Sequence, residues 1–265
     1  MLRTAAYAWE KGGTKQVVYR AADGHIHELF VPVGGSWSHA DLTQITGAPQ
    51  PDPDSAFAGY EWEAGGSKQV VYVTPNGHIH ELFVPVGGSW SHADLTQITG
   101  APLMFDHVSF TGYEWKAGGT KQVVYLTADG HIHELFVAVR GSWSHADLTQ
   151  ITGAPRPEPD TAFAGYEWKA GGSKQVVYRT EDGHIHELFV VVGGSWRHAD
   201  LTQIAGAPPA STNSPIITGY EWEAGGTKQV VYLTADGHIH ELFVAVGGSW
   251  RHADLTQRTS APPVA

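Results

Sequence analysis

Histidine is the residue type whose number and spacing in this chain could most directly do chemistry. The 265 residues include 16 histidines, and His25 and His27 lie two positions apart. In a β-strand, side chains at that spacing project from the same face of the sheet. Two imidazoles on one face can bind hydroxyl groups or supply nitrogen ligands to a metal ion. The pair recurs as His78/His80, His131/His133, His184/His186 and His238/His240.

A segment led by tryptophan follows each histidine pair. Trp37, His39, Asp41 and Thr43 alternate with other residues, so in a strand they would share one face. That face would carry an aromatic plate beside a donor, an acceptor and a hydroxyl. With an earlier tryptophan, the candidate binding residues of the first unit are Trp9, His27, Trp37, His39 and Asp41. Their copies are Trp62, His80, Trp90, His92 and Asp94; Trp115, His133, Trp143, His145 and Asp147; Trp168, His186, Trp196, His198 and Asp200; and Trp222, His240, Trp250, His252 and Asp254.

Three interpretations of these residues stay open. In the first they are structural, because buried Trp, His and Asp side chains in a covered sheet must hydrogen-bond to each other and to strand ends. In the second they form a repeated carbohydrate site, where an indole packs on the apolar face of a sugar ring and polar groups bind its hydroxyls. In the third a histidine pair and a histidine of the adjacent strand bind a metal ion.

The metal interpretation depends on a third ligand. Among the repeating residues only His39 and its copies are candidates, since Glu28 lies on the opposite face of its strand. We therefore expect no bound transition metal and no cofactor. We expect His25 and His27 to hydrogen-bond to neighbouring strands or to a ligand hydroxyl.

The sequence offers little for catalysis. It contains no G-x-S-x-G elbow, no H-E-x-x-H motif and no cysteine nucleophile. Every unit carries the same residues, whereas an enzyme of this kind usually draws different residues from different units into one centre. We expect a protein that is not an enzyme, because several equal sites suit multivalent binding, which can raise avidity by ~10²–10⁴.

The repetition itself predicts the fold. The phrases GYEW, KQVVY, DGHIHELF and GSWSHADLT return five times in identical or near-identical form with a period of about 53 residues, which is typical of a propeller blade. We predict an all-β, five-bladed β-propeller with four antiparallel strands per blade. The chain would form a single toroidal domain over residues 1–265, with repeats at 7–58, 59–111, 112–164, 165–218 and 219–262.

Strand bounds can be read from the second unit. We expect strands over Tyr60–Glu63, Lys68–Val73, His78–Val84 and Ser89–Thr96, separated by glycine-rich turns, and no helix. Should the first strand of each unit belong to the preceding blade, residues 7–10 would complete the sheet that ends near Thr256.

Composition narrows the partners. A formal charge of −11 argues against nucleic acid, which needs a basic face. The sequence has no cysteine, no apolar run long enough to cross a membrane and no visible signal peptide. We expect a soluble protein made in the cytoplasm, with release by another route and homo-oligomer formation both left open.

The four phrases together resemble the blade signature of the bacterial propeller lectins of the Photorhabdus type, over essentially the whole chain. The resemblance implies a lectin for glycans or glycoconjugates, notably L-fucose or O-methylated glycans, bound between adjacent blades. Those lectins have seven blades. With five units, the chain is similar in blade number to the horseshoe-crab tachylectin, which binds N-acetylated sugars at one site per blade.

The uniformity of the units adds an alternative. Between residues 59–102 and 219–262 only eight positions differ, and these are Thr227, Leu233, Ala235, Asp236, Ala245, Arg251, Arg258 and Ser260. Such uniformity is also expected of a symmetric structural or engineered scaffold without a small-molecule ligand.

Overall fold

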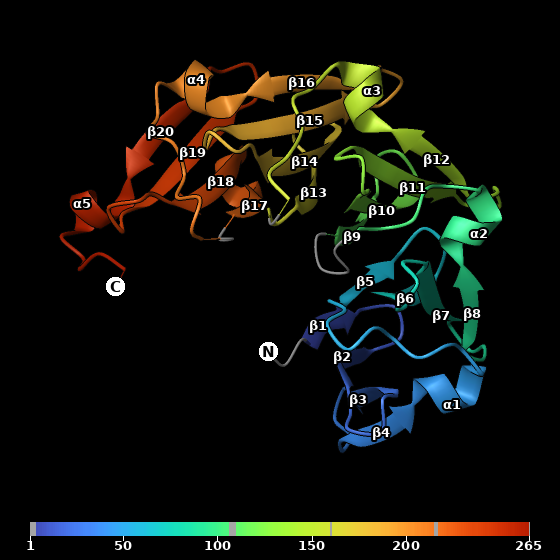
Figure 1. Ribbon diagram of the computed structural model, residues 1–265. Helices are drawn as coiled ribbons and strands as arrows, with labels where there is room; N and C mark the ends of the chain where they lie inside the picture. Colours follow the sequence, from blue (N-terminus) through green and yellow to red (C-terminus); the bar gives the residue numbers. More distant parts are fainter. Residues whose placement is uncertain (1–3, 106–109, 160, 215–216, 265) are drawn as a thin grey trace. The chain divides into compact units, whose positions relative to one another are not determined.

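The computed structural model describes residues 4–105, 110–159, 161–214 and 217–264, which form five four-stranded antiparallel sheets (Figure 1). Each sheet uses four consecutive strands of one repeat, and we number these sheets blade 1 to blade 5. The five-bladed, all-β propeller predicted from the sequence is confirmed. By its contacts the chain divides into two units, residues 1–129 with 133–146 and residues 130–132 with 147–265, and each unit is described by itself.

The elements have closely similar bounds in every blade. Blade 1 contains β1 (Thr4–Trp9), β2 (Thr14–Arg20), β3 (Ile26–Pro32), β4 (Ser38–Asp41) and α1 (Leu42–Thr46). Blade 2 contains β5 (Ala58–Trp62), β6 (Ser67–Val73), β7 (Ile79–Pro85), β8 (Ser91–Asp94) and α2 (Leu95–Thr99). Blade 3 contains β9 (Phe110–Trp115), β10 (Thr120–Leu126), β11 (Ile132–Ala138), β12 (Ser144–Asp147) and α3 (Leu148–Thr152). Blade 4 contains β13 (Ala164–Trp168), β14 (Ser173–Arg179), β15 (Ile185–Val191), β16 (Arg197–Asp200) and α4 (Leu201–Ala205). Blade 5 contains β17 (Ile217–Trp222), the 3₁₀ turn η1 (Glu223–Gly225), β18 (Thr227–Leu233), β19 (Ile239–Ala245), β20 (Arg251–Asp254) and α5 (Leu255–Thr259).

A short helix after each fourth strand contradicts the expectation of a helix-free chain. In blade 1 the strand ends at Asp41, whose Oδ1 accepts a hydrogen bond of 2.9 Å from the Gln44 amide and so caps α1. Gly47 ends the helix with φ 65°, a left-handed conformation that glycine adopts without strain. Thr43 therefore lies in the helix rather than on the strand face, and its hydroxyl accepts from the Ile26 amide at 2.9 Å. The described helices of five residues are all too short to span a membrane.

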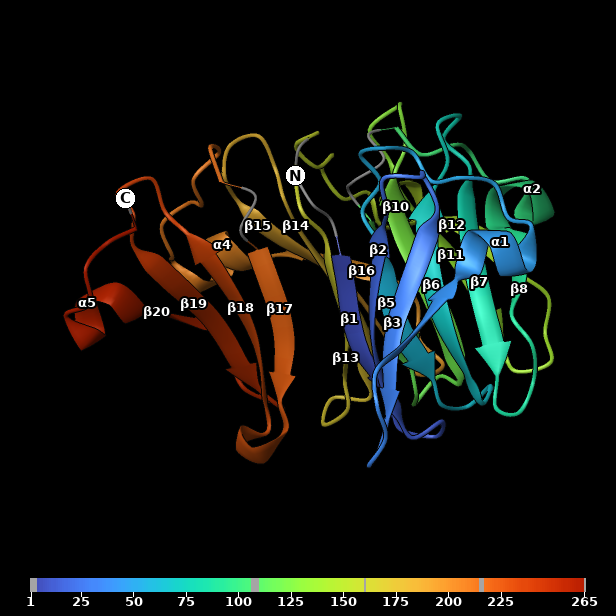
Figure 2. The same ribbon diagram turned by 90° about the horizontal axis from the view of Figure 1, so that it is seen from below.

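The first and last blades are each built from a single repeat. β1 pairs with β2 in the register Thr4 with Tyr19 to Trp9 with Thr14, and Figure 2 shows β1, β2 and β3 as neighbouring strands. In blade 5, the four strands β17 to β20 pair in order. The alternative in which residues 7–10 complete the last sheet is therefore wrong, because those residues pair with β2.

Consecutive blades within each unit pack through a continuous apolar core. Between blades 1 and 2 this core includes Ile26 and Leu42 from blade 1 and Val70, Tyr72 and Leu82 from blade 2, all fully buried. Alternation along each strand explains the core, since it gathers apolar side chains on the sheet face that meets a neighbouring blade of the same unit. Burial of such aliphatic side chains contributes about 1.5–3 kcal/mol each.

The first strands carry two residues that fit the preceding blade. A Cβ on Gly59 would lie 2.3 Å from Cε1 of Tyr7, so only glycine leaves room for that ring. The Glu61 carboxylate accepts from the amides of Glu10 and Lys11 at 3.0 and 3.1 Å. Glu114 and Glu221 bind the corresponding amides of the blades before them. Blade 1 has the exposed residues Ala6 and Ala8 at the positions of Gly59 and Glu61.

Candidate functional site

The candidate site begins with a buried ion pair between neighbouring blades. Lys68 on β6 extends toward blade 1, and its Nζ donates to Oε1 of Glu28 on β3 at 2.6 Å. Lys68 is 4% exposed and Glu28 is 1% exposed. Because an unpaired charge at this depth would cost several kcal/mol, the two residues hold each other in place.

Aromatic rings surround the lysine. Its Nζ lies 5.2 Å from the ring centroid of Trp9, 5.7 Å from that of Phe30 and 5.0 Å from that of Trp90. With Glu28 and Lys68, these rings line a cavity of about 450 Å³, which we call the interblade pocket. Cation–π attraction of this kind contributes about 0.5–2 kcal/mol per contact. The pocket therefore has aromatic walls and a charged floor.

The same arrangement recurs at two other junctions. The ion pairs Lys121–Glu81, between blades 2 and 3, and Lys228–Glu187, between blades 4 and 5, both have a shortest separation of 2.6 Å. The flanking tryptophans are Trp62 and Trp143 at 4.8 and 5.1 Å from the Lys121 nitrogen, and Trp168 and Trp250 at 4.9 and 5.1 Å from the Lys228 nitrogen. The chain thus repeats one chemical environment with the same residue types.

Burial shifts the acid–base equilibria of both charged groups. Burial raises the pKa of Glu28, against the attraction of Lys68, and burial lowers the pKa of Lys68, against the attraction of Glu28. The Lys68 ammonium has three donors, of which Glu28 accepts one. A ligand with adjacent hydroxyls would meet a donor and an acceptor side by side, between apolar rings.

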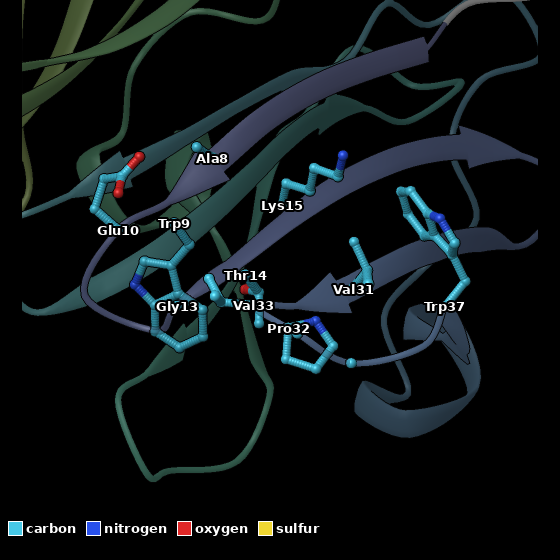
Figure 3. A pocket seen from close by; sticks show the side chains of 12 residues that line it. Ala8, Trp9, Glu10, Gly13, Thr14, Lys15, Val31, Pro32, Val33 and Trp37 are labelled. Atoms are coloured by element: carbon cyan, nitrogen blue, oxygen red, sulfur yellow. The ribbon is translucent and has the colours of Figure 1, made fainter.

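A second cavity in blade 1 is lined by a lysine and a tryptophan of the same types as those in the interblade pocket (Figure 3). There Lys15 Nζ lies 5.6 Å from the ring centroid of Trp37, and both residues line a cavity of about 530 Å³ with Trp9. Trp37 is 55% exposed. Lys15 and Trp37 correspond to Lys68 and Trp90, so this cavity has the lysine and indole of an interblade pocket.

The remaining predicted site residues gather elsewhere. In blade 1, His27 pairs in register with Asp41, and His25 Nδ1 lies 2.8 Å from Asp41 Oδ2. His27 Nε2 lies 3.1 Å from Asp23 Oδ2 and 4.0 Å from Asp41 Oδ2. We call these four residues the histidine–aspartate cluster of blade 1. The Trp9 type and the His27 and Asp41 types, expected to act in one site, thus fall into two separate places.

The clusters shift the pKa values of their histidines in opposite directions. The hydrogen bond to Asp200 raises the pKa of His184, whereas burial lowers the pKa of His186, against the attraction of Asp200. In blade 2 burial lowers the pKa of His80 to about 4, again against the attraction of Asp94.

The fourth-strand histidines lie outside both places. His39 is exposed, and its ring stacks on that of His27 with centroids 5.5 Å apart. His92, His145, His198 and His252 are exposed as well. The sequence argument treated His39 as the only repeating third ligand beside a histidine pair. The structure instead brings Asp41 to that pair, because strand pairing sets it opposite His27.

Sequence reasoning missed the lysine, glutamate and phenylalanine of the interblade pocket. A signal was present: each unit carries a lysine that begins KQVVY and a glutamate in HELF, both inside apolar strands. Charged residues at such positions are almost never buried unless paired. Their pairing across blades could have been inferred, but which residue of the next unit completes each pair depends on how the sheets pack.

No protein-family model matches the chain, and no curated protein matches it either. Several solved structures, by contrast, are similar to the chain. A lectin from Burkholderia pseudomallei aligns with a TM-score of 0.71 at 17% identity, covering 94% of this chain and 70% of that one. The Aleuria aurantia lectin, described as a six-bladed β-propeller with a novel fucose recognition mode, aligns with a TM-score of 0.63 at 17% identity, covering 99% and 81%. The SapL1 lectin in complex with α-methyl fucoside aligns with a TM-score of 0.60 at 17% identity, covering 95% and 79%. At these identities the likeness establishes the β-propeller fold.

Proposed function

We propose that the protein is a multivalent lectin that binds glycans in its interblade pockets and catalyses no reaction. The observation that carries the proposal is the recurring pocket of two tryptophans around a buried lysine–glutamate pair. Indole rings pack on the apolar C–H face of a sugar, while an ammonium and a carboxylate bind neighbouring hydroxyls. The glycan-binding residues are then Trp9 and Trp90 types from the predicted set, joined by Lys68 and Glu28 types.

Fucose is the first sugar to test. Its C5 methyl group would add an apolar contact to the pocket wall, and its hydroxyls suit the charged floor. The structural likeness to lectins described as recognising fucose or α-methyl fucoside supports this choice. So does the resemblance of the blade phrases to the Photorhabdus-type lectins, whose implied ligands include O-methylated glycans. We include the chain in that broader set of propeller lectins as part of the proposal.

Several equal pockets on one chain would give avidity. Weak sites linked on one body can bind a multivalent target ~10²–10⁴ more tightly than a single site does. We also propose that residues 1–265 act as a single domain that carries all of these pockets.

The test is calorimetric titration with α-methyl fucoside, an O-methylated fucoside and N-acetylglucosamine. We expect Trp90→Ala to abolish binding at one pocket and so to lower the measured number of sites. Trp37→Ala is the matched control, since it removes the equivalent indole outside the three pockets described above, and we expect it to leave those pockets unchanged. Heat with none of the sugars, and no signal on a glycan array, would favour the ligand-free scaffold.

A further inference from the structure

Each histidine–aspartate cluster brings three ligand groups close together, away from the interblade pocket. In blades 4 and 5 these groups are two histidines and an aspartate, and in blade 1 they are His27, Asp23 and Asp41. In blade 4, His184 Nδ1 lies 2.7 Å from Asp200 Oδ2, and His186 Nε2 lies 4.0 Å from the same oxygen. All three ligand atoms lie within 4.8 Å of one another, and the same holds for His238, His240 and Asp254 in blade 5. The second histidine is too far from the aspartate for a hydrogen bond, so hydrogen bonding alone does not explain why three groups converge.

The aspartate of each cluster is oriented by the helix that follows it. Asp200 accepts from the Gln203 amide with Oδ1 at 2.9 Å, which leaves Oδ2 directed at the histidines. Asp41 and Asp254 divide their two oxygens in the same way. One carboxylate thus serves as helix cap and as a fixed ligand atom. Such preorganisation lowers the entropic cost of assembling a metal site.

Blade 1 brings a second carboxylate into its cluster. Asp23, in the turn before β3, brings its Oδ2 to 3.1 Å from His27 Nε2. Asp41 Oδ2 lies 4.0 Å from the same nitrogen, and the ligand atoms of Asp23, His27 and Asp41 all lie within 4.8 Å of one another. Nitrogen and carboxylate ligands at about 2.0–2.2 Å in tetrahedral geometry are those that Zn²⁺ prefers, and they place ligand atoms about 3.3 Å apart. The observed separations bracket that value.

We propose that the histidine–aspartate clusters of blades 1, 4 and 5 are binding sites for a divalent transition metal ion of the Zn²⁺ type. In blades 4 and 5 the ligands are Nδ1 of the first histidine, Nε2 of the second and Oδ2 of the aspartate. In blade 1 they are Nε2 of His27 and Oδ2 of both Asp23 and Asp41. Water completes the coordination at each site. Access is open, because His184, His186 and Asp200 line a cavity of about 570 Å³.

Blade 2 provides a natural comparison within the chain. Its turn carries Asn76 where blade 1 carries Asp23, and the Asn76 side chain accepts from the Thr74 hydroxyl at 2.6 Å. His78 Nδ1 also lies 3.1 Å from the Thr96 hydroxyl. An amide is a weaker ligand than a carboxylate for this class of ion, so blade 2 lacks the turn ligand that Asp23 supplies in blade 1.

The test titrates the metal-free protein with Co²⁺ and with Zn²⁺. Co²⁺ in a four-coordinate nitrogen and oxygen site gives intense visible absorption, and calorimetry with Zn²⁺ gives the number of sites and their affinity. The test variant combines His27→Gln, His184→Gln and His238→Gln. The control variant combines His39→Gln, His198→Gln and His252→Gln, which removes the same number of exposed histidines outside the clusters. Near-ultraviolet circular dichroism of the tryptophans confirms that both variants fold.

We expect the test variant to lose one equivalent of bound metal, or more than about 10-fold in affinity, for each altered cluster. The control variant should bind as the unmodified protein does. Asp23→Asn, which gives blade 1 the turn residue of blade 2, should weaken one site and leave the others. Equal losses in both triple variants, or no binding of either ion at millimolar concentration, would overturn the proposal. A chelator should leave fucose binding unchanged, so this proposal and the lectin proposal can fail separately.

Discussion

Blade 1 and blade 2 present the same lysine and tryptophan in two different environments. Lys68 of blade 2 meets Glu28 and Trp9 of the preceding blade and is 4% exposed. Lys15 of blade 1 is exposed, and its Nζ lies 5.6 Å from the ring centroid of Trp37. The comparison teaches that the lysine by itself specifies neither a buried ion pair nor a pocket. The neighbouring repeat supplies the counter-charge that makes its burial tolerable.

The largest difference between the two blades should come from the lysine itself. We expect Lys68→Met to lower the free energy of unfolding by about 3–5 kcal/mol, because it leaves the Glu28 carboxylate buried without its partner. Lys15→Met should change it by less than about 1 kcal/mol, since the side chain is exposed. Denaturation in guanidinium chloride measures both.

A double variant sharpens the same test. Adding Glu28→Leu to Lys68→Met removes both buried charges and should restore most of the lost stability. If Lys68→Met and Lys15→Met lower the free energy of unfolding equally, burial of the lysine does not change its contribution to stability.

The next largest effect on stability should come from the first strands of blades 1 and 2, where Gly59 lies against the Tyr7 ring. Gly59→Ala would set a Cβ 2.3 Å from the Tyr7 ring, and relief of such a clash typically costs about 1–3 kcal/mol. At the equivalent position of blade 1, Ala6→Gly should cost no more than about 1 kcal/mol, as glycine does in a strand. A fully stable Gly59→Ala variant would show that the two strands separate easily.

Loss of the carboxylate between first strands should have a smaller effect. Glu61→Gln replaces charge-assisted hydrogen bonds to the Glu10 and Lys11 amides with neutral ones, and we expect a loss of about 1 kcal/mol. Ala8→Glu introduces the same side chain in blade 1 and should change stability by less than about 0.5 kcal/mol. Thermal unfolding followed by circular dichroism separates the two, and a gain of stability in Ala8→Glu would indicate amides at hand in a neighbouring blade.

The smallest effect on stability at neutral pH should come from substitution of His80. Burial lowers its folded-state pKa to about 4, whereas an unfolded histidine titrates near pH 6.5. Between these values the unfolded chain binds the extra proton, so this histidine lowers stability as pH falls from about 6.5 to 4 and has no such effect above pH 7. His80→Gln should flatten that acid limb in unfolding curves, while the exposed His92→Gln should leave its slope unchanged.

The fold could be predicted from the sequence because the repeat period, the turn glycines and the alternation along each strand all agree. The short helices were missed because Leu42 to Thr46 continues the alternating pattern of the strand, and only the cap formed by Asp41 marks the change. The site was predicted less well. The structure places Trp9 and Trp90 of the predicted set beside one cavity, whereas the pairing of Lys68 with Glu28 depends on sheet packing, which period and alternation do not encode.

The first strands join consecutive repeats through contacts that have a direction. The later repeat supplies the glycine and the glutamate, as Gly59 and Glu61 do in blade 2, and the earlier repeat supplies the tyrosine ring and the two amides. Blade 1 has Ala6 and Ala8 at the positions of that glycine and glutamate. Moving blade 1 to a later place in the chain would therefore lose these contacts, so the repeats are not interchangeable in order.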